Sequence, residues 1–250
     1  MRNCFFYVLS AGPIPDHIAF IMDGNRRYAK KHNVNESAGH RIGYRALISM
    51  LRYCYELGIK YVTVYAFSID NFKRGPEEVE SLMELLEEKM ESLLKQDSIV
   101  NQYGVRVHFA GDLNLLNKPV HTAAQRLMES TSVNKKAVLS VCIAYTSTNE
   151  IVRAVQNAYE DRSEFGKGKC SLRLVDIERS LDLSVAPDPD IIIRTSGETR
   201  MSNFLLWQSA RCLLYSPSAL WPEIGFWHLV WAVLEFQKMH SYLEKKKKQV

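Results

Sequence analysis

Several residue patterns that mark common protein classes are missing from this sequence of 250 residues. The five cysteines are scattered and form no CxxC pair, which argues against a zinc site or a disulfide framework and favours a reducing compartment. Neither GxxxxGK[ST] nor GxGxxG occurs, so a P-loop and a dinucleotide fingerprint are not expected. There is no DDxxD pair, and no apolar run approaches the roughly 20 residues that a membrane span needs.

Strong charge of one sign is also lacking. The formal net charge is +4, and Lys245 to Lys248 alone contribute four positive charges. A nucleic-acid-binding protein usually carries a denser basic stripe, so no nucleic-acid partner is expected. Hydrophobic residues make up 46% of the chain and charged residues 24%, which is typical of a globular protein whose length suits one large α/β domain.

The two ends differ from the rest of the chain. Residues 1–11 contain the short apolar run Cys4 to Leu9, which is too short for a signal peptide. It either packs on the fold or dips into a membrane surface. Residues 243–250 form a basic C-terminal tail, and the domain between these ends is expected to span residues 12–242.

Strand and helix patterns alternate along the chain. Strands are predicted at 17–22, 61–67, 105–110, 137–145 and 190–194. Helices are predicted at 41–57, 76–96, 119–131, 149–161, 175–183 and 227–242, with a loop at 163–171. This alternation predicts an α/β fold with a mostly parallel central sheet flanked by helices. The Leu and Met stripe of helix 76–96 either packs on the sheet or walls an apolar tunnel.

Polar clusters follow three of the predicted strands. In parallel sheets, ligands bind beyond the carboxyl ends of the strands, so these clusters are expected to converge on one rim. Their members are Asp23, Gly24, Asn25, Arg26 and Arg27 after the first strand, Ser68, Asn71 and Arg74 after the second, and Arg194, Arg200 and Ser202 after the last.

These clusters suit an anion, although simpler interpretations remain open. Gly24 permits a tight turn into a helix, whose free N–H groups bind phosphate, and Asp23 suits a magnesium ion shared with phosphates. Equally, Asp23 could be a helix cap beside solvated arginines. The third cluster offers arginine forks around the turn at Ser196, which can present backbone N–H groups, or it is a polar surface loop. His40 is a base, a phosphate ligand or a structural residue.

At these residues the sequence resembles the cis-prenyltransferase (undecaprenyl diphosphate synthase-like) family. The resemblance covers about Gly12 to Tyr242 and rests on HIAFIMDGNRRYAKK, GHRIGY, YAFSIDNFKR, IRTSGETRMSNFLLWQ and LWPE. Within the family, the chain is most similar to eukaryotic dehydrodolichyl diphosphate synthase catalytic subunits. YELGIKY, AYTSTNEI and SPSALWPEIG resemble the plant branch, which includes rubber cis-prenyltransferases.

The resemblance implies an activity and a role for each cluster. The fold would contain an apolar tunnel, and the enzyme would condense isopentenyl diphosphate with an allylic diphosphate such as farnesyl diphosphate. The product would be a dehydrodolichyl diphosphate for dolichol and protein glycosylation, or alternatively a rubber-type polymer. Asp23 would bind Mg²⁺, and Asn71 would serve catalysis with Ser68 and Arg74. The remaining implied roles are allylic diphosphate binding by Gly24, Asn25, Arg26, Arg27 and His40, and isopentenyl diphosphate binding by Arg194, Arg200 and Ser202.

Three departures from the family pattern concern assembly. Leu213 stands where bacterial homodimeric members have a metal-binding glutamate, and Lys245 to Val250 contain no Arg-x-Gly. Glu36 replaces a basic residue, which puts one phosphate contact in doubt. The resemblance therefore implies a homologous, reticulon-4B-receptor-like accessory subunit that supplies Arg-x-Gly. Through it, the chain would lie peripherally on the cytosolic face of the endoplasmic reticulum membrane, with the cytosol as the alternative.

A non-catalytic scaffold subunit is the rival hypothesis. Accessory subunits of this family generally lose the DGNR and NFxR residues. This chain keeps them, with Asp23, Asn25 and Arg27 in the first motif and Asn71 and Arg74 in the second. The catalytic role is therefore favoured.

Overall fold

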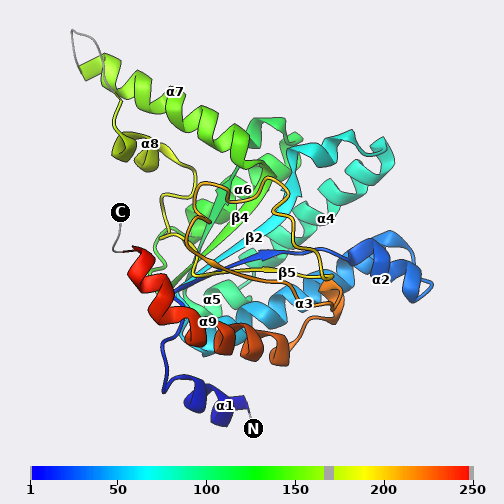
Figure 1. Cartoon of the computed structure of the whole chain (residues 1–250). Helices are drawn as coiled ribbons and strands as arrows, with labels where there is room; N and C mark the ends of the chain where they lie inside the picture. Colours follow the sequence, from blue (N-terminus) through cyan, green and yellow to red (C-terminus); the bar gives the residue numbers. More distant parts are fainter. Residues whose placement is uncertain (1, 166–171, 248–250) are drawn as a thin grey trace.

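Strands and helices alternate through the computed structural model, which describes residues 2–165 and 172–247 (Figure 1). The strands are β1 (His17–Ile21), β2 (Tyr61–Ser68), β3 (Val105–Ala110), β4 (Ala137–Tyr145), β5 (Ile191–Arg194) and β6 (Leu213–Tyr215). The helices are α1 (Arg2–Leu9), α2 (Asn25–Lys31), α3 (Glu36–Glu56), α4 (Pro76–Leu94), α5 (Ile99–Tyr103), α6 (Lys118–Thr131), α7 (Ser147–Phe165), α8 (Leu174–Ser180) and α9 (Phe226–Lys247). Short 3-10 turns are η1 (Ile69–Lys73), η2 (Leu113–Leu115) and η3 (Trp221–Glu223).

The six strands form one sheet in the order β3-β4-β2-β1-β5-β6, and every neighbouring pair is parallel. The parallel α/β fold predicted from the alternation is therefore confirmed. β2, β1 and β5 are adjacent in the middle of the sheet, so the three polar clusters that follow them leave the same edge. The sequence predicted that the three clusters converge on one rim of the sheet, and this placement agrees with that prediction.

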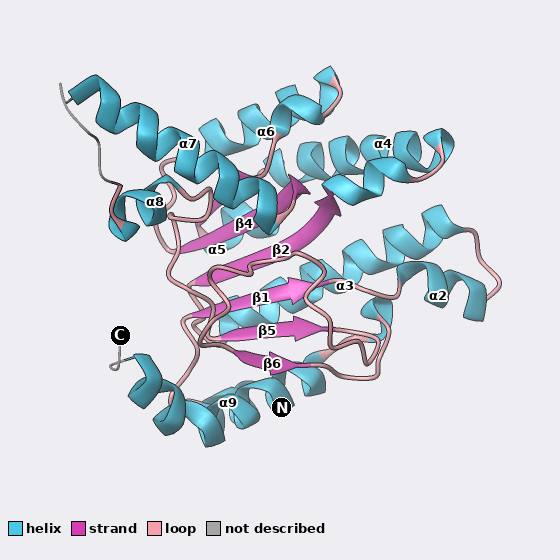
Figure 2. Ribbon diagram, turned by 45° about the horizontal axis from the view of Figure 1, so that its top comes forward, coloured by secondary structure: helices cyan, strands magenta, loops and turns pink. Residues whose placement is uncertain are grey.

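Helices or loops cover both faces of the sheet (Figure 2). Side chains alternate along β1, so that Ile18 and Phe20 belong to the larger core cluster and Ala19 and Ile21 to the smaller one. The larger cluster holds residues of α3, α4, α6 and α9, and the smaller one lies under the loop after β5. Because both faces are buried, the central strands read as continuous apolar runs.

The ends of several elements differ from the prediction. α3 begins at Glu36, where the side chain of Asn35 accepts a hydrogen bond from the N–H of Ala38 at 2.7 Å and caps the helix. α9 continues to Lys247, so the first part of the predicted tail is helical. α7 extends into the predicted loop 163–171, of which residues 166–171 lie outside the described residues. α1, α5 and β6 are too short for periodicity to indicate them.

The N-terminal apolar segment packs on the fold. Phe6 and Leu9 of α1 are buried, and the ring of Phe5 meets that of Trp227 in α9 with centroids 4.8 Å apart. Tyr7 and Val8 are exposed on the same short helix. None of the helices in the described ranges is long and apolar enough to cross a membrane.

Candidate active site

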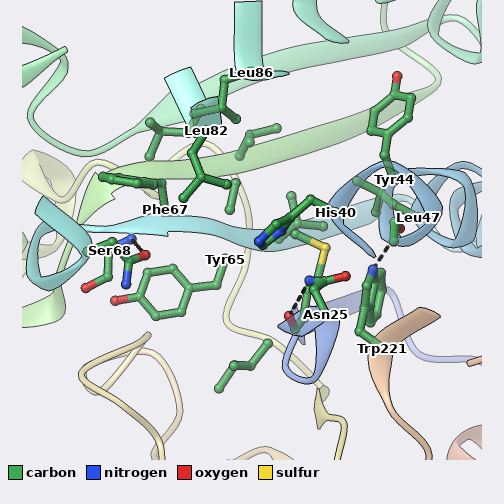
Figure 3. A pocket seen from close by; sticks show the side chains of 18 of the residues that line it. Asn25, His40, Tyr44, Leu47, Tyr65, Phe67, Ser68, Leu82, Leu86 and Trp221 are labelled. Atoms are coloured by element: carbon green, nitrogen blue, oxygen red, sulfur yellow. Dashed lines mark hydrogen bonds between the residues drawn. The ribbon is translucent and has the colours of Figure 1, made fainter. Parts of the chain in front are cut away.

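A cavity of about 720 Å³ opens at the carboxyl ends of β1, β2 and β5. Its mouth is polar, whereas its depth is walled by apolar side chains of two facing helices (Figure 3). α3 contributes Leu47, Ile48 and Leu51, and α4 contributes Leu82, Leu85, Leu86, Met90 and Leu93. The stripe of α4 therefore packs on the core and also lines this cavity.

Most of the predicted site residues line this cavity. They are Asp23, Asn25, His40, Ser68, Asn71, Arg74, Arg194, Arg200 and Ser202. Gly24, Arg26 and Arg27 are not among its lining residues in the described structure. Arg27 still contacts the lining carboxylate of Asp23, and Arg26 lies 3.9 Å from the carboxylate of Glu78. The three predicted loops therefore meet at one cavity, and nine of the twelve predicted residues line it.

The carboxylate of Asp23 is held between two arginines. It accepts hydrogen bonds from Arg194 at 2.7 Å and from Arg27 at 3.1 Å. Burial acts to raise the pKa of this carboxyl, but the two arginines outweigh burial, so its pKa lies below the ordinary value. Asp23 is therefore an anion at neutral pH. Its side chain does not cap α2, whose N-cap is Gly24, so that simpler interpretation is wrong.

Three groups fix the backbone of Asp23. Its carbonyl oxygen accepts hydrogen bonds from the hydroxyl of Thr195 at 2.6 Å, the hydroxyl of Ser196 at 2.9 Å and the N–H of Trp221 at 2.9 Å. The next residue, Gly24, has φ of 115°, and a Cβ there would lie 2.6 Å from Oγ of Ser196. Glycine is required at this turn because both the backbone conformation and the close approach exclude a side chain.

The backbone of the turn after β5 does not offer the anion site that the sequence suggested. The N–H of Ser196 donates to the carbonyl of Ala219 at 2.7 Å, and the N–H of Gly197 donates to the carbonyl of Pro217 at 2.8 Å. Both donors are used within the fold, so this expectation is corrected. The arginine side chains of this loop remain the candidates for binding an anion.

Arg194 organises the rest of that loop. Besides Asp23, its guanidinium donates to the carbonyl oxygen of Arg200 at 2.5 Å and to the hydroxyl of Ser202 at 2.6 Å. Its Nε is buried without a hydrogen-bond partner among the described residues. Arg200 itself is exposed and pairs with Glu198, which also contacts Arg27 at 3.4 Å. Arginines from two loops thus converge around Asp23 and Glu198.

The loop after β2 has a compact geometry of its own. The N–H of Ser68 donates to Oδ1 of Asn71 at 2.9 Å, and the hydroxyl of Ser68 accepts from the N–H of Asp70 at 3.2 Å. This reciprocal cap orients Asn71 at the mouth of the cavity. Arg74 donates to Glu78 at 2.7 Å, so it too is held in place before any ligand binds.

Two polar atoms on the opposite side of the mouth have no described partner. They are Oδ1 of Asn25 and Nε2 of His40, both buried and both in residues that line the cavity. Burial lowers the pKa of His40 and the positive charge of Arg74 lowers it further, so the ring is neutral at neutral pH. An orphaned buried polar atom is costly, which makes these atoms candidates for ligand contacts.

A preformed metal cluster is not present in the part of the chain that the structure describes. No three His, Cys, Asp or Glu side chains there are grouped so that they could hold an ion. Mg²⁺ that is shared with phosphates needs only one or two protein carboxylates, however. The single carboxylate of Asp23 at the cavity mouth fits that coordination.

Comparison with known proteins agrees with this geometry. Residues 21–243 match a prenyltransferase family model described as "Putative undecaprenyl diphosphate synthase". The chain belongs to this family. The cis-prenyltransferase resemblance that the sequence motifs indicated is thereby confirmed.

Three relatives and one solved structure show how similar the chain is to other family members. It is 57% identical to a dehydrodolichyl diphosphate synthase of Solanum lycopersicum, covering 100% of this chain and 93% of the relative. It is 50% identical to a rubber cis-polyprenyltransferase of Hevea brasiliensis, covering 99% and 92%. The complex subunit of human dehydrodolichyl diphosphate synthase is 45% identical, covering 95% and 72%. The crystal structure of lavandulyl diphosphate synthase from Lavandula x intermedia matches with a TM-score of 0.83 at 28% identity, covering 90% and 95%.

Tyr65 and Trp221 are among the residues that line the cavity of this cis-prenyltransferase without having been predicted as site residues. The hydroxyl of Tyr65 donates to the carbonyl of Tyr145 at 3.1 Å, and its ring stacks on Phe204 at 4.6 Å. Trp221 contacts both Asp23 and the helix α3. The alternation of side chains along β2 could have placed Tyr65 on the face opposite Val64. Trp221 lies in the LWPE segment that carries part of the family resemblance, and that segment could have pointed to it.

Proposed function

We propose that this chain is a catalytic cis-prenyltransferase subunit that condenses isopentenyl diphosphate with an allylic diphosphate such as farnesyl diphosphate. The product would be a long-chain cis-polyprenyl diphosphate of the dehydrodolichyl type. One observation carries this proposal: a single cavity joins an arginine-rich mouth to an apolar depth. Such a cavity suits ligands with an anionic head and a hydrocarbon tail.

The mouth can stabilise the charge that the reaction develops. The allylic C–O bond breaks, diphosphate leaves with growing negative charge, and a new C–C bond forms to isopentenyl diphosphate, which then loses a proton. Preorganised cationic donors at the leaving group supply the largest catalytic contribution in such reactions. Arg194 and Arg200 would bind the isopentenyl diphosphate with Ser202, and Asn71, held by Ser68, would orient the reacting groups.

The allylic diphosphate would lie at the other side of the mouth. Asn25 and His40 have unpartnered buried polar atoms there, and both residues line the cavity together with Asp23. Arg26, Arg27 and Arg74 are proposed to contact this diphosphate after exchanging their present carboxylate partners. Asp23 would hold Mg²⁺ together with diphosphate oxygens, and the bound ion would neutralise charge on the leaving group.

The decisive assay uses purified protein, farnesyl diphosphate, labelled isopentenyl diphosphate and magnesium, with and without a candidate accessory subunit. Incorporation of label into long products supports the catalytic role. The rival role as a non-catalytic scaffold predicts no incorporation that depends on residues of this chain. The intact cavity, with Asn71 and Arg74 in place at its mouth, favours the catalytic role.

Product class has two candidates. Relatives named as a dehydrodolichyl diphosphate synthase and as a rubber cis-polyprenyltransferase are 57% and 50% identical to this chain, respectively. The higher identity supports a dehydrodolichyl product, which serves dolichol synthesis and protein glycosylation. The rubber-type alternative is tested in the same assay by the length of the labelled product.

A homologous accessory subunit with a C-terminal Arg-x-Gly is proposed to complete the site. Leu213 stands where bacterial members of the family are expected to have a metal-binding glutamate, and its side chain cannot bind a metal ion. The human relative is named as a complex subunit, which supports this assembly. Leu206 and Leu214 are exposed near the edge strand β6, and they fit a pairing surface. The buried side chains of Phe204 and Leu205 cannot belong to such a surface.

Peripheral association with the cytosolic face of the endoplasmic reticulum membrane is also proposed. One face of α9 exposes Trp227, Trp231 and Tyr242 together with Lys238. Aromatic and basic side chains in this combination favour the boundary between lipid headgroups and hydrocarbon. This face would add a direct contact to any contact made through the accessory subunit, and a cytosolic pool is the alternative.

A further inference from the structure

Trp221 connects two parts of the site that are far apart in the sequence. Its indole N–H donates to the carbonyl oxygen of Gly43 in α3 at 2.8 Å, the contact drawn as a dashed line in Figure 3. Its backbone N–H donates to the carbonyl of Asp23 at 2.9 Å. The side chain is 1% exposed and packs against Phe20 with ring centroids 5.8 Å apart. One residue therefore ties the loop after β1 to the helix α3.

The close contact between α3 and Trp221 requires a glycine at position 43. A Cβ at Gly43 would lie 3.1 Å from Cδ1 of Trp221 and 2.1 Å from Oδ1 of Asn25. Only glycine lets α3 approach both side chains this closely. His40 lies one helical turn before Gly43, so a shift of α3 at Gly43 moves His40 with it.

The contact between Trp221 and Gly43 lies beside two polar atoms that have no hydrogen-bond partner among the described residues. Oδ1 of Asn25 and Nε2 of His40 are buried and unbonded among the described residues, and both residues line the cavity, as Trp221 does. Asn25 follows Asp23 by two residues, whereas the distance of His40 from Asp23 and Asn25 depends on how α3 docks on the loop after β1. The two hydrogen bonds of Trp221 act on that docking from both sides.

We infer that Trp221 is a positioning residue for the allylic diphosphate, holding His40 at a fixed spacing from Asp23 and Asn25. This inference rests on the proposed function of the site. Trp221 is not a catalytic residue, because its polar atom donates to a backbone carbonyl. The indole N–H of Trp221 donates to α3, and neither Arg194 nor Arg200 hydrogen-bonds to that helix in the described structure, so loss of this one bond should leave the isopentenyl diphosphate site unchanged.

The test compares Trp221→Phe with wild type. Calorimetry would measure the Kd of farnesyl thiodiphosphate, a non-reactive allylic analogue, and the Kd of isopentenyl diphosphate. We expect the analogue to bind about three- to tenfold more weakly, the range for one lost hydrogen bond, and the Kd of isopentenyl diphosphate to stay within about twofold. The KM values for the two substrates, measured with the accessory subunit where turnover needs it, should separate in the same way.

Two further variants serve as a control and as a test of the indole N–H alone. Trp231→Phe makes the same change at an exposed position of α9 and should alter neither Kd. Benzothienylalanine at position 221, introduced by nonsense suppression, retains the shape of the ring and removes only the N–H. It should reproduce the selective loss even if Trp221→Phe folds poorly.

Three outcomes decide the question. A selective loss of analogue binding in the benzothienyl variant supports the inference. Equal weakening of both ligands with a lower Tm would show that Trp221 is only a core residue. Wild-type affinity for both ligands in that variant would also overturn the inference while leaving the proposed function standing. If wild type binds neither diphosphate even in the presence of the accessory subunit, the proposed function itself is wrong.

Discussion

The guanidinium of Arg194 donates to the carboxylate of Asp23 across 2.7 Å, joining the ends of β5 and β1. The Arg194 side chain is 7% exposed and that of Asp23 is 25% exposed, so the pair is shielded from water. Breaking such a pair leaves a buried charge without compensation. The metal-binding candidate and an isopentenyl diphosphate candidate are therefore coupled before any ligand arrives.

Asp23→Ala should lower magnesium-dependent turnover by orders of magnitude, because it removes the carboxylate proposed to hold the ion. The fold should persist, although Arg194 loses its partner and the Tm should fall. Asp23→Asn retains an acceptor for Arg194 and is the matched control: it should recover stability and not turnover. Turnover measured against magnesium concentration, together with thermal melts, gives both readouts. Near-normal turnover in either variant would refute the role of Asp23.

Arg194→Ala and Arg200→Ala should each raise the KM for isopentenyl diphosphate. If a charged hydrogen bond is lost, the rise should correspond to a loss of about 1.5–3 kcal/mol in binding free energy. Only Arg194→Ala should also lower the Tm, since Arg200 is exposed whereas Arg194 is buried. Arg126→Ala removes an exposed arginine of α6 and serves as the control. Steady-state kinetics at saturating farnesyl diphosphate measure the effect. An unchanged KM in both variants would place the isopentenyl diphosphate site elsewhere.

The isolated chain should show little or no activity, and an accessory subunit with a C-terminal Arg-x-Gly should restore it. The partner's arginine and backbone would supply positive charge where diphosphate leaves. Label incorporation is compared for the chain alone, the mixed complex, and a complex whose partner carries Ala-x-Ala. Equal rates for the chain alone and the complex, in preparations free of host prenyltransferases, would contradict the idea.

His17 should make stability depend on pH. Burial lowers its pKa from 6.5 to about 4, although its hydrogen bond to the carbonyl of Pro187 opposes the shift. As pH falls below 6.5, the unfolded chain takes up a proton that the folded chain refuses, so the free energy of unfolding decreases down to about pH 4. A shift of this size corresponds to about 3 kcal/mol in total. His17→Asn should flatten this part of the profile in urea titrations; an identical slope in both proteins would disprove the assignment.

Trp227→Ala with Trp231→Ala should reduce binding to anionic lipid vesicles in flotation experiments, because the two indoles leave the exposed face of α9. Val152→Ala with Tyr159→Ala removes exposed apolar groups from α7 and should have no such effect. High salt should weaken binding if basic residues contribute. If the tryptophan variant instead changes only the oligomeric state, the face binds protein and not lipid.

The sequence by itself determined strands β1 to β5, the long helices and the loops that carry the polar clusters. Apolar runs and helical spacing are local properties, and parallel strands place their carboxyl ends together whatever the details of packing. Asp23, Asn71 and Arg194 could therefore be assigned to one rim before the structure was considered. The apolar stripe of α4 was equally visible, although its role as a tunnel wall was left open.

Only the tertiary structure decided which atoms at that rim are available. The N–H groups of Ser196 and Gly197 donate to the carbonyls of Ala219 and Pro217. Arg27 pairs with Asp23 and Glu198 and does not line the cavity. The contact between Trp221 and Gly43 joins positions 178 residues apart. Such pairings depend on how separate elements dock, because a hydrogen bond forms only when donor and acceptor lie within a short distance. A local sequence pattern carries no information about that distance.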